Sequence, residues 1–503
     1  MFLSVATVLD ESARRYPDRV AVVDGDTRLT YWELWARALR CAGALRASGV
    51  RPGDRVAVLL PNSADFLYAY YGALAAGAAV VPVHGLLVAD EVAYVLRHSG
   101  SVALISGGPL WPVAEEGARA AGVRAVHGVP TDGDPLPAPE PAAPDDIAVV
   151  LYTSGTTGRP KGALLTHFNI VMNASVTAHD LLGLTGDDVI LGCLPLFHSY
   201  GQTCAMNATL RAGATLVLMR RFSGAGALEL LAAEGVSVFM GVPTMYHALV
   251  EAVVQDATAR DDTTRRLTLR AAVSGGAALP VAVLERFEET FATQVLEGYG
   301  LTETSPVATF NQPALGRRPG TVGHPVWGVE IGVADAAVED AVVLLPEGEV
   351  GEVVVRGHNV FAGYLDDPAA TAAAVVDGWF RTGDLGVRDE DGFLSIVDRK
   401  KDLVIRGGFN IYPREVEEVL VRHPAISEVA VIGVPDEARG EEICAVVVLR
   451  AEAGAVTEED VIAWSRDRLG RHKYPRIVRF TETLPLGPTG KVLKRALTAT
   501  SSS

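Results

Sequence analysis

The segment from Asp146 to His167 constrains the fold more strongly than any other part of the sequence. Its first residues, DIAVVLYT, form an apolar run that predicts a buried strand over 146–153. The chain then enters SGTTGRPKG, a turn of small and hydroxyl-bearing residues that contains one lysine, Lys161. A loop of this kind offers backbone N–H groups and hydroxyls to one concave site, which suits phosphate oxygens, and the lysine adds a flexible positive charge. The segment therefore predicts a strand followed by a phosphate-binding loop.

The order of residues in this loop excludes a Walker A motif. That motif places glycine directly before the lysine and serine or threonine directly after it. Here Pro160 precedes Lys161 and Gly162 follows it. The residues alone leave two interpretations, a phosphate loop of another class or a flexible turn without a ligand.

The charge and the cysteine content narrow the class of protein. The 503 residues carry a formal net charge of −17 and no basic tract, which argues against nucleic acid as a partner. Cys41, Cys193, Cys204 and Cys444 lie far apart, so neither a zinc ribbon nor a disulfide framework is indicated. The N-terminus lacks the basic start and apolar core of a signal peptide. We therefore expect a protein of a reducing, cytoplasmic compartment without a membrane span.

Alternating helical and strand patterns predict an α/β fold. Apolar runs of strand length recur at 55–61, 78–83, 214–219, 236–243 and 269–276. They alternate with helical patterns, as in layered α/β proteins, and from about residue 322 short strands and turns take over. We predict a large N-terminal domain over 1–397, with two α/β layers and a small β-barrel-like part. A hinge at 398–402 and a small mobile α+β domain at 403–503 complete the prediction.

Four motifs follow the loop in order along the chain: YGLTET (299–304), GWFRTGDLG (378–386), DRKKDLVIRGGFNIYPREVE (398–417) and PTGKVLKR (488–495). Together with TSGTTGRPKG (153–162) they resemble the signature motifs of the adenylate-forming superfamily, which includes acyl-CoA synthetases, the adenylation domains of peptide synthetases and firefly luciferase. The resemblance extends from about residue 31 to the end of the chain. VLEGYGLTETSP (295–306) and PLFHSYG (195–201) look most like the fatty-acyl-CoA ligases.

The resemblance implies a two-step reaction. The carboxylate of an acid attacks the α-phosphate of ATP, with Mg²⁺ bound, to give acyl-AMP and pyrophosphate, and a thiol then displaces AMP. The thiol would belong to CoA or to the phosphopantetheinyl arm of an acyl carrier protein. The sequence contains no GxSxG elbow and no plausible Cys–His pairing, which fits direct attack by the thiol without a side-chain nucleophile.

The resemblance also implies nucleotide-binding roles. Glu303 would bind Mg²⁺, which prefers oxygen ligands, and Thr302 would bond the α-phosphate. The ring of Tyr299 would lie on adenine, and Asp384 with Arg399 would hold the ribose hydroxyls. From the residues alone, Glu303 could instead be a solvated loop acid and Asp384 a turn cap. The expected nucleotide-binding residues are Thr153, Ser154, Gly155, Thr156, Thr157, Gly158, Lys161, Gly276, Tyr299, Gly300, Asp384 and Arg399.

The C-terminal motifs imply a catalytic lysine and a moving domain. By resemblance, Lys491 would enter the site and stabilise the charge that develops between the carboxylate and the α-phosphate. Lys494, three residues later, is expected at the surface. Lys401 occupies the hinge position, and rotation about it would gate the second step by replacing Lys491 with the loop at Gly407 and Gly408. Two glycines there suit close passage of a pantetheine arm.

The expected acid pocket is small-walled and uncharged. Amino-acid-activating relatives carry Asp after the Phe of PLFHSYG, but here His198 follows Phe197. The arginines of malonate-activating relatives correspond to Gly298 and Ala248, which would leave a second carboxylate without a counter-ion. An aliphatic acid is favoured, and an aryl acid stays open. His198 is expected either to gate the pocket, as a catalytic-site residue, or to bond locally. The predicted walls are His198, Val242, Ser274, Gly275, Gly276, Gly298 and Gly300.

The acceptor and the reaction class have alternatives. CoA requires positive charge for its 3′-phosphate, and Arg471, His472, Lys473 and Arg476 form a candidate patch that could also be a solvated turn. A phosphotransferase would release ADP and would require a Walker-type or kinase-type loop, which the sequence lacks. A non-catalytic nucleotide-binding protein on the same fold would predict loss of Glu303, Asp384 or Lys491, and all three are present.

Overall fold

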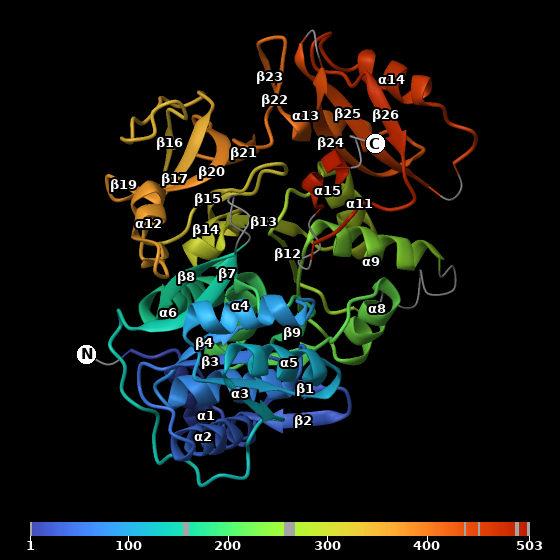
Figure 1. Cartoon of the computed structure of the whole chain (residues 1–503). Helices are drawn as coiled ribbons and strands as arrows, with labels where there is room; N and C mark the ends of the chain where they lie inside the picture. The colour runs from blue at the N-terminus through green and yellow to red at the C-terminus, as the bar shows by residue number, and fades with distance from the viewer. Residues whose placement is uncertain are drawn as a thin grey trace.

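The computed structural model describes residues 3–153, 160–255, 267–436, 439–450, 453–487 and 492–499. Within this part of the chain the strands form four sheets. Figure 1 shows two large sheets with their helices in the lower and central part, a smaller β unit on one side and the C-terminal strands at the top. The described part contains no helix long and apolar enough to cross a membrane.

The first large sheet carries the strand that leads into the phosphate loop. It has seven strands in the order β18-β8-β7-β4-β3-β5-β6. The strands from β7 to β6 are parallel neighbours, while β7–β8 and β8–β18 pair antiparallel. The bounds are β3 Arg55–Leu59, β4 Ala79–Pro82, β5 Ala103–Ser106, β6 Arg124–His127, β7 Ile147–Thr153, β8 Lys161–Thr166 and β18 Gly363–Tyr364. The predicted strand at 146–153 is confirmed as β7.

The second large sheet has nine strands in the order β15-β14-β13-β12-β11-β9-β10-β1-β2. From β13 to β1 all neighbours are parallel, and the antiparallel pairs lie at the two edges. The bounds are β1 Val20–Asp24, β2 Thr27–Thr30, β9 Val189–Gly192, β10 Thr215–Leu218, β11 Val238–Gly241, β12 Ala271–Ser274, β13 Val295–Gly300, β14 Val307–Phe310 and β15 His324–Pro325. The apolar runs near 214, 236 and 269 are therefore strands, as predicted.

Helix α3 (Ala64–Ala75) joins the core of the two large sheets. It contacts β3 and β4 of one sheet and β1 of the other, and all of its residues except Asp65 are buried. A helix buried on all sides is expected to be apolar around its whole circumference, which this one is. The other helices of the large domain are α1 Ala6–Arg15, α2 Tyr31–Ala47, α4 Ala89–Ser99, α5 Trp111–Ala121, α6 His167–Ser175, α7 Ala208–Ala212, α8 Gly224–Ala233, α9 Pro243–Gln255, α11 Val281–Phe291 and α12 Pro368–Ala374.

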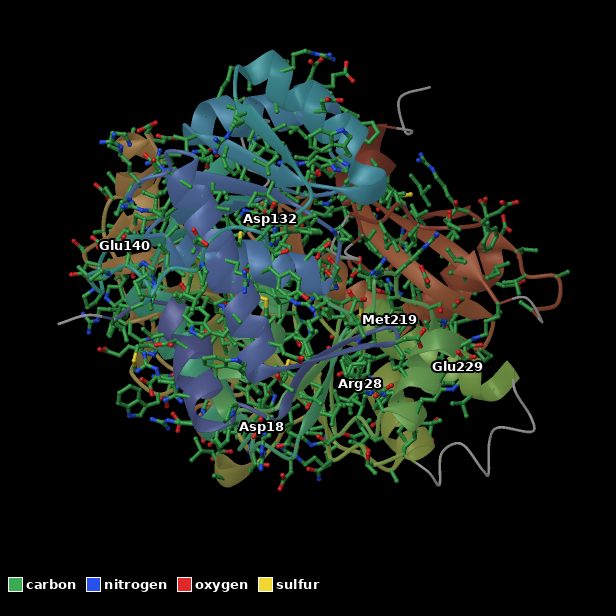
Figure 2. All side chains as sticks on the ribbon, turned by 90° about the horizontal axis from the view of Figure 1, so that it is seen from below. Asp18, Arg28, Asp132, Glu140, Met219 and Glu229 are labelled. Carbon is green, nitrogen blue, oxygen red and sulfur yellow. The ribbon has the colours of Figure 1, made fainter. Side chains whose placement is uncertain are left out.

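At the surface of the large domain, an ion pair joins two segments that are distant in the sequence. Arg28 on β2 forms an ion pair with Glu234 at the end of α8 (3.0 Å), and Figure 2 labels Arg28 and Glu229 of α8 in that region. Residues 128–146 form a loop without helix or strand, on which Figure 2 labels Asp132 and Glu140. The four cysteines are buried as free thiols.

Two smaller sheets follow. One has the order β16-β17-β20-β19, with β21 also paired to β20, and is the small β part predicted from the sequence. The C-terminal sheet has the order β23-β22-β25-β24, with β26 paired to β25. The bounds are β16 Val329–Ala334, β17 Gly351–Gly357, β19 Val375–Val376, β20 Trp379–Arg388, β21 Leu394–Arg399, β22 Val404–Arg406, β23 Phe409–Ile411, β24 Ile426–Asp436, β25 Gly440–Leu449 and β26 Ile477–Phe480. The predicted fold class, a large α/β unit with a small α+β unit, is confirmed.

The C-terminal sheet is covered by α13 (Pro413–Leu420), α14 (Glu458–Arg466) and α15 (Lys494–Ala499). Lys494 is not a solvated surface lysine: its Nζ lies 2.7 Å from Glu417 Oε1, and its side chain is only 24% exposed. The expectation of a surface position was wrong, because α15 packs on β24 and brings this lysine against α13. The domain limits 1–397 and 403–503 and the hinge between them stay predictions.

Candidate active site

The predicted phosphate loop connects β7 to β8. Thr153, the last residue of β7, pairs with Lys161, the first residue of β8. Tyr94 of α4 donates a hydrogen bond to the carbonyl of Pro160 (3.0 Å), which fixes the end of the loop next to Lys161. The expected phosphate-binding residues Ser154, Gly155, Thr156, Thr157 and Gly158 lie outside the described residues.

Lys161 lies close to Tyr364, the last residue of β18, and to Asp367, which follows that strand. Its Nζ forms an ion pair with Asp367 Oδ2 at 3.2 Å. The same ammonium lies 5.3 Å from the centre of the Tyr364 ring, within the range of a cation–π contact. Tyr364 in turn donates a hydrogen bond from its hydroxyl to Glu303 Oε1 at 2.9 Å. These contacts link the lysine of the loop to the candidate metal ligand.

Glu303 belongs to a short 3₁₀ turn, η4 (Thr302–Thr304), between β13 and β14. It is 8% exposed, and burial raises the pKa of its carboxyl above the usual value, opposed by its hydrogen bond from Tyr364. The charges of Arg399 and Asp384 also act on this carboxyl. Mg²⁺ usually takes one or two protein carboxylates and completes its shell with water and phosphate oxygens. One buried carboxylate, linked through Tyr364 to Lys161, fits that donor set.

A second group of contacts forms around Asp384. Tyr299, on β13, donates its hydroxyl hydrogen to Asp384 Oδ2 at 2.7 Å. Arg399, paired with Asp384 across β20 and β21, places its Nε 3.1 Å from Oδ1. Asp384 is 4% exposed, and each of its oxygens keeps a second acceptor position. The structure therefore brings Tyr299, Asp384 and Arg399 together in an arrangement that can accept ribose hydroxyls.

Two of the predicted glycines are required by the backbone. A Cβ on Gly300 would lie 1.7 Å from the carbonyl oxygen of Pro306, so no side chain fits between β13 and the chain that returns from η4. Gly276 has φ +81°, in the left-handed region that favours glycine. Both glycines let the backbone turn closely at the carboxyl ends of β12 and β13, which is where ligands bind in open α/β sheets.

Tyr200 packs against the predicted acid pocket. A Cβ on Gly275 would lie 3.2 Å from Cζ of the Tyr200 ring, so the ring covers that glycine. The Tyr200 hydroxyl donates to the carbonyl of Val273 at 3.1 Å, and the side chain is buried. Ser274 and Val242 are buried beside these strands, whereas a Cβ on Gly298 would meet the Phe310 ring at 2.9 Å. Sequence reasoning missed Tyr200, which the PLFHSYG motif contained.

His198 has a local contact. Its Nδ1 accepts a hydrogen bond from the backbone N–H of Tyr200 at 3.3 Å. The side chain is half-buried between Phe197 and the start of η3 (Tyr200–Asn207). The contact supports the local alternative for this histidine, and a gating role stays a prediction.

Glu297 is a buried acid next to the nucleotide motif that sequence reasoning passed over. It lies on β13 two residues before Tyr299, is 5% exposed, and accepts a hydrogen bond from the backbone N–H of Gly320 at 3.0 Å. Burial raises the pKa of its carboxyl from 4.5 to about 7, although the Gly320 N–H and the charge of Arg414 lower it.

We expect the Glu297→Gln variant to be more stable than the wild type at pH 8 and equally stable near pH 4. Between pH 4.5 and about 7 the folded state keeps a proton on Glu297 that the unfolded state has released. The free energy of unfolding of the wild type therefore falls as the pH rises through this range. The full shift corresponds to roughly 3 kcal/mol. Thermal melting of both proteins across pH 4–8 checks this, and a constant difference in melting temperature would contradict it.

The hinge position follows Arg399 by two residues, whereas the pantetheine loop lies at the tip of a hairpin. Partial desolvation and the nearby charge of Arg399 lower the pKa of Lys401, an exposed residue between β21 and β22. Gly407 and Gly408 form the turn of the β22–β23 hairpin, with φ +57° and +83°. Figure 1 shows this hairpin projecting from the top of the molecule, away from β7, β8 and β13. The tip of this hairpin therefore lies apart from β13, the strand that carries Tyr299.

The candidate CoA patch lies beside this hairpin. The rings of Phe409 and His472 are 5.0 Å apart, and Phe409 is 58% exposed. Lys473 is neutralised by Glu415, whose two oxygens each lie 2.8 Å from Nζ. Arg476 lies over the Tyr474 ring and donates to the carbonyl of Arg471. The four candidate residues lie on neighbouring turns beside the hairpin, but the charge of Lys473 is already paired with Glu415.

Lys491 lies outside the described residues. The chain on either side of that segment is held by an antiparallel bridge between Leu486 and Val492. A catalytic role for Lys491 stays a prediction.

The C-terminal sheet contacts α9 of the large domain through an ion pair between Arg450 and Glu251 (3.6 Å).

Comparison with known proteins shows which family the sequence matches. The model of the AMP-binding enzyme family matches residues 9–365, and that of the AMP-binding enzyme C-terminal domain matches residues 415–491. A long-chain-fatty-acid–CoA ligase of Bacillus subtilis is 36% identical, over 98% of this chain and 94% of its own. A feruloyl-CoA synthase of an Amycolatopsis species is 38% identical, over 96% of each chain. The crystal structure of ATP-bound MatB from Rhodopseudomonas palustris has a TM-score of 0.90 at 34% identity, over 100% of this chain and 99% of its own.

Proposed function

Because the chain belongs to the AMP-binding enzyme family, we propose that it joins a carboxylic acid with an uncharged, preferably aliphatic, tail to the thiol of CoA. The observation that carries the proposal is a grouping of three residues near β13. They are Lys161, the buried Glu303 proposed to bind the metal, and the buried Asp384 proposed to bind the ribose. Lys161 reaches Glu303 through Tyr364, and Glu303 lies within the electrostatic reach of Asp384 and Arg399. ATP is the ligand that needs all three groups at once.

The reaction would proceed in two balanced steps. A carboxylate oxygen of the acid attacks the α-phosphorus of ATP and expels pyrophosphate, which leaves acyl-AMP. The thiol sulfur then attacks the acyl carbon, loses its proton and expels AMP. A bound Mg²⁺ neutralises phosphate charge in the first step. Lys161 would offset charge on the leaving pyrophosphate, Asp384 and Arg399 would hold the ribose, and Lys491 would stabilise the charge transferred at the α-phosphate.

The uncharged tail follows from the predicted pocket walls. Gly275, Gly276, Gly298 and Val242 bring no counter-ion, and a buried charge without one is costly. The Bacillus subtilis relative acts on long-chain fatty acids and the Amycolatopsis relative on ferulate, as their names state. We favour an aliphatic acid, and an aryl acid is the alternative that the assay must separate.

We expect Tyr200→Ala to extend the range of accepted acids toward longer chains. Tyr200 covers Gly275 and is tied to the carbonyl of Val273, so its ring closes the pocket at that point. Removing a buried aromatic ring leaves a cavity, and one to three added methylenes would fill it with a gain of about 0.8 kcal/mol each. Comparing kcat/KM across saturated acids of rising length checks this. An unchanged length profile in a folded variant would show that Tyr200 does not line the acid pocket.

The proposed function is tested by measuring pyrophosphate and AMP with fatty acids of rising length, cinnamate, benzoate and malonate. Each acid is supplied with CoA and, separately, with a phosphopantetheinylated acyl carrier protein, and mass spectrometry identifies the product. We expect AMP, pyrophosphate and an acyl-CoA thioester from an uncharged acid. Transfer from acyl-AMP to the carrier protein alone would show that the acceptor is a protein instead of CoA. ADP as the product would overturn the proposal.

A further inference from the structure

The lysine of the phosphate loop motif is already paired with a carboxylate. Lys161 Nζ lies 3.2 Å from Asp367 Oδ2, and the two residues come from β8 and from the turn between β18 and α12. A carboxylate oxygen at this distance occupies the position that a phosphate oxygen takes beside a lysine. In this structure Asp367 therefore stands where a phosphate ligand of Lys161 would stand.

Asp367 is held in place by the backbone. Its Oδ1 accepts a hydrogen bond from the N–H of Ala370 at 2.9 Å, so the residue is the N-cap of α12, with Pro368 at the first helical position. Asp366, directly before it, has φ +52°, a conformation that costs a non-glycine residue free energy. The side chain is thus presented to Lys161 by a fixed turn.

Tyr364 places this ion pair next to the metal-type carboxylate. The Lys161 ammonium lies over the Tyr364 ring, and the hydroxyl of that ring is bonded to Glu303. Lys161 therefore contacts both the Asp367 carboxylate and the Tyr364 ring, whose hydroxyl is bonded to Glu303. Rotation of its flexible side chain is enough to move it from the carboxylate to a phosphate.

The ion pair is accessible to water. The side chains of Lys161 and Asp367 are 24% and 38% exposed, and Asp367 lines an open pocket of about 570 Å³ together with Tyr364, Asp366 and Thr371. A solvated ion pair of this kind is weak and is exchanged readily for a more highly charged partner. Pyrophosphate and the β- and γ-phosphates of ATP are such partners.

We propose that Asp367 is a positioning residue that competes with the phosphates of ATP and pyrophosphate for Lys161. Asp367 forms the ion pair with Lys161 when no phosphate is bound, and the same ion pair forms again when pyrophosphate leaves. Its effect is to weaken the binding of the product and so to help its release. This inference rests on the proposed function in that Lys161 is taken as a phosphate ligand.

The test is the Asp367→Asn variant. Asparagine is as good an N-cap as aspartate, so α12 keeps its cap while the negative charge is removed. We expect the dissociation constants of ATP and of inorganic pyrophosphate, measured by calorimetric titration of the full chain, to fall by about fivefold. The inhibition constant of pyrophosphate in the adenylation assay should fall to the same extent, while the KM for the acid is unchanged.

Two controls separate this effect from a general change in charge or structure. Asp366→Asn removes the same charge one residue away, and asparagine tolerates its left-handed conformation, so both phosphate constants should change by less than twofold. In a Lys161→Met background, Asp367→Asn should no longer tighten pyrophosphate binding, because the residue acts through the lysine. A gain that persists in that background would overturn the proposal.

Unchanged or weaker binding of pyrophosphate to Asp367→Asn would also overturn it. The titration with pyrophosphate needs no acid and no thiol, so its outcome is independent of the substrate assay. If the wild type forms no acyl-AMP with any acid but the variant binds pyrophosphate more tightly, the proposed function fails and the competition stands. If the wild type forms acyl-AMP and the variant constants do not change, only the competition fails.

Discussion

Lys491→Ala is expected to abolish acyl-AMP formation and to leave thiol transfer from supplied acyl-AMP largely intact. Lys491 is proposed to stabilise charge that develops only while the carboxylate attacks the α-phosphate, and removing one such group typically costs about 10²–10³-fold in rate. The second step would take place after the small domain has rotated and withdrawn this lysine. The two half-reactions are measured separately, as pyrophosphate release from ATP and acid, and as thioester formation from synthetic acyl-AMP.

The second half-reaction serves as the internal control for folding of this variant. Lys491→Arg keeps a positive charge but presents it as a planar fork, so we expect adenylation between that of the wild type and that of the alanine variant. Equal loss of both half-reactions in Lys491→Ala would contradict the assignment.

Glu303→Gln is expected to reduce adenylation by about 10²–10³-fold and to raise the Mg²⁺ concentration needed for half-maximal rate. The amide oxygen of glutamine can still accept the hydrogen bond that Tyr364 donates to Glu303 Oε1, so the fold around η4 should be preserved. The substitution removes the negative charge of the carboxylate, which Mg²⁺ as a hard cation favours in a protein ligand. The rate of pyrophosphate release is measured as a function of Mg²⁺ concentration.

Glu330→Gln is the matched control for this variant. Glu330 is an exposed acid on β16 that pairs with Arg356, so its substitution removes one charge without touching the candidate site. We expect its Mg²⁺ dependence to match that of the wild type. A Glu303→Gln variant with the wild-type dependence would show that Glu303 does not bind the metal.

The strands were within reach of sequence reasoning because their signals are local. The expected nucleotide-binding residues were named from motifs, and their roles stay predictions. The apolar runs at 146–153, 214–219 and 269–276 each carry their burial pattern in adjacent residues. Tyr299 and Asp384, which motifs pointed to, lie 85 positions apart in the sequence, and the structure brings them together with Arg399.

The residues that sequence reasoning missed depend on contacts between distant segments. Tyr364 and Asp367 contact Lys161, which lies about 200 positions earlier in the sequence. No local sequence pattern indicates that these residues are close in space. The Asp-Asp-Pro run at 366–368 does indicate a helix start, but not what the aspartate faces. Lys494 was misjudged for the same reason, since its partner Glu417 belongs to another helix.

The account depends on acyl-AMP as the intermediate, and an isotope experiment tests this most directly. The acid is labelled with ¹⁸O in both carboxylate oxygens and converted with ATP, Mg²⁺ and CoA, and the AMP is analysed by mass spectrometry. Attack of the carboxylate on the α-phosphorus places one labelled oxygen in each AMP, and we predict that result. Unlabelled AMP, or label in inorganic phosphate with ADP as the other product, would contradict the account.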